Sequence, residues 1–272
     1  MKSFELRKDW SDWVKLIAAI LVAVSHYSTV VVINNHWSDS SFLRLWCQGG
    51  YIGVALFFFF SGYGLMESDA KKHLSVSGFF RKRFLKVYLP VLMVSVIWIP
   101  VYYKYIGSID FNMWTFLYDV FWDFRDCVLW FVKILFLLYG FFCIFTYLLH
   151  RKKTVMSHTL IAFGTITATW LAYYNGYPFI SVPLFLLGVW SSNVKEKGLY
   201  GVPLPFLLIS AMALIYGIFF LLYKSADALH GVVNCIILLL ILGGCVMAKR
   251  FTPPITFKLL SICYIYIVYC TF

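Results

Sequence analysis

Long apolar runs recur along this chain from residue 13 to its last residue, and they constrain its fold more than any other feature. A helical run of about 20 apolar residues matches the hydrocarbon thickness of a bilayer. The composition agrees, because 62% of the 272 residues are hydrophobic and 13% are charged, and soluble domains carry about twice that charged fraction. The sequence therefore predicts a multi-pass membrane protein without a separate soluble domain.

Nine apolar runs are the expected spans, and in lipid each must be helical so that its backbone polar groups are paired. The predicted fold class is all-α, a polytopic membrane helix bundle of about nine to ten transmembrane helices in one domain, 1–272. The ninth run holds 14 residues, too few to cross a bilayer comfortably, so a truncated C-terminus is one interpretation. The runs are 13–34, 50–66, 87–106, 128–149, 159–174, 178–192, 203–223, 231–247 and 259–272.

Basic residues alternate between the segments that connect these runs. Of the 23 Lys and Arg residues, 17 fall in the N-terminus and the even-numbered loops, and four, including Lys104 near the end of the third run, fall in or beside the other loops. Loops rich in Lys and Arg stay on the cytoplasmic side, so the N-terminus is predicted to be cytoplasmic. The net charge of +11 then reports orientation in the lipid bilayer, and it requires no nucleic acid partner.

The first run carries ionisable side chains. Asp12 and Lys15 are one helical turn apart and His26 follows Lys15 by eleven residues, so all three lie on roughly one face of a helix. Lys15 and His26 are then about 16 Å apart along the axis, with the lysine at a membrane surface and the histidine inside the bilayer. An ionisable residue inside a span is costly and indicates a functional site. The alternative is a histidine that hydrogen-bonds a neighbouring helix.

Two of the runs match motifs of a known family. The first has an acidic residue three positions before a basic one and a histidine eleven positions after it, and it resembles the opening motif of the acyltransferase family 3 membrane proteins. The second resembles that family's Gly-Val-x-x-Phe-Phe-x-x-Ser-Gly segment, whose small residues permit close helix approach. The matching residues are Asp12, Lys15 and His26, then Gly53, Val54, Phe57, Phe58, Ser61 and Gly62.

A basic stretch before the third run is similar to the family's Arg-x-x-Arg element, which falls here on Arg83 and Lys86. Together with Arg81, these cations can bind the phosphates of a soluble anion. The alternative is a polybasic patch that binds anionic lipid or fixes topology. Both interpretations are expected to hold for different members of the cluster.

The chain departs from the family pattern at several positions. Lysine stands at positions 15 and 86, where arginine is commoner, so the charge is kept but the bidentate fork is lost. Ala55 occupies a position that often carries an aspartate, and family members usually have ten spans.

The resemblance implies an integral membrane O-acyltransferase located in the cell membrane as a multi-pass protein. It would move an acyl group, expected to be acetyl, from cytoplasmic acyl-CoA to a hydroxyl of a cell-envelope polysaccharide or lipid-linked glycan. His26 would act as general base, and Asp12 would orient Lys15 or pair with it. The phosphates of the acetyl-CoA donor would be bound by Lys15, Arg81, Arg83 and Lys86.

The resemblance implies no tightly bound cofactor, no metal and no covalent nucleophile. The alternative function from another class is a transporter or flippase for an anionic or glycan substrate, in which His26 would relay protons.

Three weaker features complete the sequence. Aromatic residues and carboxylates within 107–127 suit either a sugar-binding surface or an amphipathic helix lying in the interface. Cys47 and Cys127 fall on the predicted outer side, where a disulfide can form, although unpaired cysteines also pack well in apolar interiors. Solvation or helix capping is the role expected of three histidines that flank loops, His150, His158 and His230.

Overall fold

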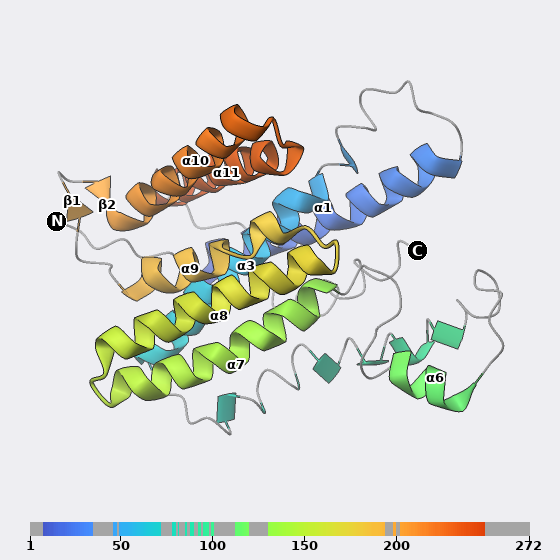
Figure 1. Cartoon of the computed structure of the whole chain (residues 1–272), viewed down its shortest axis with the longest axis horizontal. Coiled ribbons are helices and arrows are strands. Elements are labelled where there is room, and N and C mark those ends of the chain that lie inside the picture. The colour runs from blue at the N-terminus through green and yellow to red at the C-terminus, as the bar shows by residue number, and fades with distance from the viewer. Residues whose placement is uncertain are drawn as a thin grey trace. The chain divides into compact units, whose positions relative to one another are not determined.

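The structure is a computed structural model in which the described elements are helical apart from one short strand pair, which confirms the predicted all-α class (Figure 1). The described residues are 8–34, 46–47, 49–71, 112–119, 130–193, 198–199 and 202–247, with scattered positions from 78 to 100. The chain forms two compact units: Met1–Lys72 joined with Ile161–Phe272, and His73–Leu160.

The first unit contains most of the described helices, and α8 runs from one unit into the other. In the first unit lie α1 (Lys8–Asn34), α3 (Gly49–Lys71), the 3-10 turn η4 (Phe179–Ser181), α9 (Leu184–Asn193), the paired strands β1 (Gly198–Leu199) and β2 (Val202–Pro203), α10 (Leu204–Tyr223) and α11 (Ala226–Met247). In the second unit lie α6 (Met113–Tyr118), α7 (Trp130–His150) and the first residues of α8 (Thr154–Tyr174).

Five of the described helices are long and apolar enough to cross a bilayer, namely α3, α7, α8, α10 and α11. α1 has 27 residues, so it is about 40 Å long and exceeds the thickness of a hydrocarbon core. These helices confirm a multi-pass membrane protein. The expected runs 87–106 and 259–272 lie mostly or wholly outside the described residues, so the number of spans and the side of the N-terminus stay predictions.

α3 is the central helix of the first unit. Its sequence is apolar around the whole circumference, which is typical of a helix buried on all sides, and the side chains from Phe57 to Phe60 are all buried. α1 and α9 pack along it, and α11 and η4 also contact it (Figure 1). The predicted site on α1 therefore rests against a helix that is itself fixed on several sides.

Glycines let α3 approach its neighbours closely, as small residues do in membrane helices. A Cβ built on Gly53 would lie 2.5 Å from a backbone oxygen of α1. Gly62 of α3 and Gly188 of α9 meet at one crossing, where a Cβ on Gly62 would overlap the carbonyl oxygen of Phe185 and one on Gly188 would overlap that of Phe59. The close approach expected from the second-run motif is confirmed at both Gly53 and Gly62.

In the second unit, aromatic rings from the segment between 78 and 100 pack on α7. Phe79 is 3% exposed, and its ring centroid lies 5.9 Å and 6.0 Å from two ring centroids of α7. The ring of Tyr88 packs edge-on against a third α7 ring at 5.7 Å. These contacts fix residues on both sides of the basic stretch, whose Arg83 and Lys86 lie outside the described residues.

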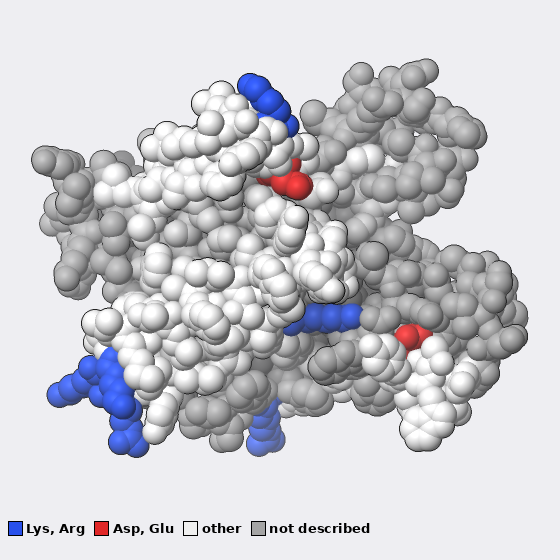
Figure 2. Space-filling model, in the orientation of Figure 1, with Lys and Arg blue, Asp and Glu red and all other residues white. Residues whose placement is uncertain are grey.

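On the face shown in Figure 2, few charged side chains lie along the described helices. Basic side chains gather at the turn that joins α7 to α8, where Arg151, Lys152 and Lys153 are exposed (Figure 2). α10 is the most apolar and least buried of the five helices that could cross a bilayer. The mean hydropathy of its most apolar stretch is 2.4, and only 6% of that stretch is buried by the described residues. Such a helix surface suits lipid tails and not water.

Candidate functional site

α1 carries three of the predicted site residues. Lys15 Nζ lies 3.9 Å from Asp12 Oδ1, and the two side chains are 35% and 51% exposed. The predicted pairing of Asp12 with Lys15 is therefore present in the structure, as a partly exposed ion pair at the start of the helix. His26 lies further along the same helix and is half-buried.

The face of α1 that carries Lys15 and His26 is turned toward the interior of the protein. At about 100° per residue, eleven residues bring the two side chains to within about 20° of each other around the axis. Ala19 and Val22 share that face and are 0% and 4% exposed, whereas Ile20, which points away from it, is 44% exposed. Lys15 and His26 therefore share a partly buried face of α1, whereas Asp12 is exposed.

Contacts with α3 fix the level of His26 in the first unit. The hydroxyl of its neighbour Ser25 donates a hydrogen bond to the carbonyl oxygen of Cys47 at 2.6 Å. A Cβ built on Gly50 would lie 2.7 Å from Ser25 Oγ, so the first turn of α3 packs directly on the Ser25 side chain. His26 is therefore level with the first turn of α3, and Lys15 lies about 16 Å further toward the opposite end of α3.

The predicted donor-binding cations lie in two different units. Lys15 belongs to the first unit, and Arg81 belongs to the second unit and is exposed. Arg83 and Lys86 lie outside the described residues. Within the first unit, Asp12, Lys15 and His26 share one helix.

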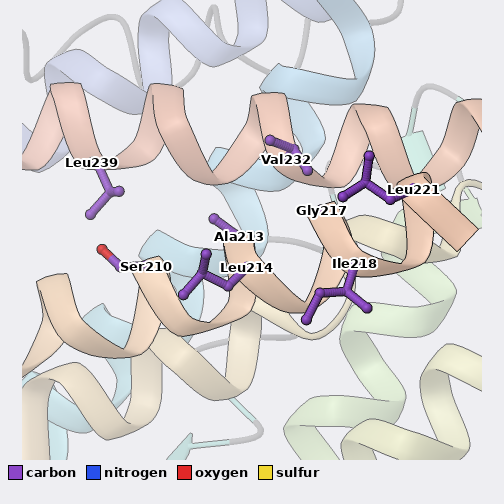
Figure 3. A pocket seen from close by; sticks show the side chains of 8 residues that line it. All are labelled: Ser210, Ala213, Leu214, Gly217, Ile218, Leu221, Val232 and Leu239. Atoms are coloured by element: carbon purple, nitrogen blue, oxygen red, sulfur yellow. The ribbon is translucent and has the colours of Figure 1, made fainter.

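Two apolar grooves occur in the first unit. One has a volume of about 510 Å³ and lies between α10 and α11, where aliphatic side chains and the hydroxyl of Ser210 line it (Figure 3). The other, of about 410 Å³, lies between α8, η4 and α9 and is lined mainly by aliphatic and aromatic side chains. Neither groove is lined by an ionisable group other than a tyrosine, so both suit lipid chains better than a reaction centre.

Comparison with known families decides the class of this chain. A family model described as an acyltransferase domain matches residues 8–272. The chain belongs to acyltransferase family 3. No curated protein and no solved structure matches it. With its apolar helices, it is a multi-pass membrane acyltransferase.

The aromatic side chains of α6 and the neighbouring carboxylate of Asp119 differ in exposure. In α6, Trp114 is 80% exposed and Tyr118 is 55% exposed, as a surface that stacks on sugars or sits in the interface requires. Asp119 is 1% exposed, so its carboxylate does not offer an acceptor at that surface. Cys47 is a free, half-buried thiol, and Cys127 lies outside the described residues.

The interpretation of two loop-flanking histidines was wrong. His150 is exposed, as expected. His158 and His230 are half-buried, and the Nδ1 atom of each is buried without a hydrogen-bond partner in the described part of the chain. Helix packing explains both cases, because α8 and α11 begin before the predicted runs and carry the histidines into the bundle.

The sequence analysis did not predict two contacts that polar residues of this acyltransferase make between helices. The Ser192 hydroxyl donates to Glu67 Oε1 at 2.7 Å and joins α9 to α3. The imidazole of His230 stacks on the ring of Tyr51, with centroids 4.6 Å apart and planes 14° apart. Polar residues inside apolar runs were the available signal, but their partners are distant in sequence and no local pattern identifies them.

Proposed function

We propose that this chain is an integral membrane O-acyltransferase that moves an acetyl group from acetyl-CoA to a hydroxyl of a cell-envelope polysaccharide or lipid-linked glycan. The single observation that supports this proposal is the placement of three groups along α1, where the partly exposed Asp12–Lys15 ion pair lies at the start of the helix and half-buried His26 follows on the face of Lys15. An extended donor can bind a cation with its phosphates while its thioester reaches about 16 Å further along the helix.

The chemistry needs one group that accepts and then returns a proton. In the proposed reaction, His26 takes the proton of the acceptor hydroxyl as its oxygen attacks the thioester carbonyl carbon. The C–S bond of the tetrahedral intermediate then breaks, and the leaving CoA sulfur takes the proton from the imidazolium. An imidazole suits this role because its pKa is ordinarily near neutrality.

The cations have the complementary role of binding the donor. Lys15 contacts a donor phosphate, and Asp12 holds the ammonium group in place. Arg81, Arg83 and Lys86 of the second unit supply further phosphate contacts. Lysine at positions 15 and 86 gives point charges in place of bidentate forks, so we expect each to contribute charge more than geometry.

Mass spectrometry of the envelope glycan tests the proposed function. Glycan from cells that carry the chain should be heavier by whole acetyl masses than glycan from cells that lack it. Purified protein in nanodiscs should also transfer labelled acetyl groups from acetyl-CoA to glycan that mild base has de-O-acetylated. Identical glycan masses together with no transfer in vitro would refute the proposal.

Replacing Lys15 with methionine should weaken donor binding, because the flexible stem is kept and the charge is lost. The concentration of acetyl-CoA at half-maximal rate should rise about tenfold or more, as expected for a lost charge-assisted hydrogen bond. Lys15→Arg should restore most of the affinity. Lys153→Met, at the exposed turn after α7, is the matched control and should bind the donor as the wild type does; equal affinities for Lys15→Met and Lys153→Met would rule out the role of Lys15.

A further inference from the structure

The first turns of α11 contain two buried polar atoms that have no hydrogen-bond partner in the described part of the chain. They are Nδ1 of His230 and Nδ2 of Asn234. The two residues are four positions apart on one helix, so their side chains lie on the same face. Asn234 is 3% exposed, and an amide without a partner is costly in the interior of a membrane protein.

The surroundings hold these groups rigidly. The imidazole of His230 stacks on Tyr51 of α3 at 4.6 Å. Beside it, η4 is fixed from two sides, because the Tyr216 hydroxyl donates to the carbonyl oxygen of Ile180 at 2.9 Å and η4 also contacts α3. The two polar atoms therefore belong to a helix packed against fixed neighbours and not to a loop.

The position of His230 along α3 relates His230 and Asn234 to the acceptor and not to the donor. Tyr51 follows Gly50, which meets Ser25 of α1, so His230 is level with His26 along α3. Lys71 lies at the other end of α3, twenty residues away, or about 30 Å. A group at this end of α3 lies away from the end toward which Lys15 is placed.

We infer that His230 and Asn234 bind a hydroxyl group of the acceptor glycan. The inference rests on the proposed function. A hydroxyl oxygen accepts a hydrogen bond from the Asn234 amide, and the hydroxyl proton donates to His230 Nδ1, so one alcohol group satisfies both atoms. The stacked rings of Tyr51 and His230 add an aromatic surface beside it.

Two substitutions test this inference in the full-length protein in nanodiscs, with acetyl-CoA as donor and de-O-acetylated envelope glycan as acceptor. Asn234→Leu keeps the side-chain volume and removes the amide. His230→Phe keeps a ring on Tyr51 and removes both nitrogens. Each should raise the glycan concentration at half-maximal rate about tenfold, while the acetyl-CoA concentration at half-maximal rate and the unfolding midpoint stay unchanged.

His158→Phe is the matched control, because His158 also has a buried Nδ1 without a partner in the described residues but belongs to the second unit. It should not change glycan saturation. Unchanged glycan saturation in both test variants would overturn the inference and assign the two atoms to trapped water. A lowered unfolding midpoint, or equal effects on donor and glycan, would overturn it in favour of a structural role. Wild-type protein that transfers nothing, together with envelope glycan of unchanged mass, would refute the proposed function itself.

Discussion

His26→Ala should lower the rate of acetyl transfer by about 10²- to 10⁴-fold, the usual contribution of a positioned general base. The loss should appear in the maximal rate, because the imidazole acts on the reacting hydroxyl and the donor phosphates bind elsewhere. Affinity for acetyl-CoA should stay near the wild-type value. Transfer of labelled acetyl groups and equilibrium binding of acetyl-CoA measure the two quantities separately.

His150→Ala is the control for this variant, because His150 is an exposed histidine at the end of α7. It should transfer acetyl groups at the wild-type rate. A His26→Ala protein that folds and keeps the wild-type rate would show that another group is the base. A transporter would be favoured instead if the wild type forms no acyl product and His26→Ala lowers the flux of a solute across the membrane.

Alanine at Gly62 or Gly188 should destabilise the first unit by about 1–3 kcal/mol each, the usual cost of overpacking. The new Cβ would overlap a backbone carbonyl oxygen of the facing helix in both cases, and backbone atoms cannot rotate away as a side chain can. The free energy of unfolding in detergent or bicelles measures the effect. Because both glycines lie at one crossing of α3 and α9, the double variant should deviate from additivity.

Gly64→Ala is the matched control on the same helix, because nothing lies within 4 Å of a Cβ at Gly64. It should leave the stability unchanged or raise it by up to about 1 kcal/mol through helix propensity. Equal stabilities for Gly62→Ala, Gly188→Ala and Gly64→Ala would show that α3 and α9 do not meet as described.

Hydropathy predicted the helices well and their ends less well. The second run was expected to end at residue 66, because Glu67, Ser68 and Asp69 are polar. α3 continues to Lys71, since Ser192 of α9 donates a hydrogen bond to Glu67 and the Ser68 hydroxyl bonds the carbonyl oxygen of Gly64. A partner that lies 125 residues away cannot be read from local composition.

Part of the candidate site followed from helix geometry alone. The spacing of Asp12, Lys15 and His26 fixes their common face in any regular helix, and α1 is regular over this stretch. The outcome for His230 shows where such reasoning ends. Its position near a predicted loop suggested solvent, but the ring stacks on Tyr51, a residue of a different span.

The exposed surface of α10 has a consequence for handling the protein. Because few apolar side chains of α10 are buried by described residues, the helix depends for most of its stability on the lipid or detergent around it. We expect short-chain detergents to loosen α10 and its partner α11 before the α1–α3–α9 core, so purification should favour long-chain detergents or native lipid throughout.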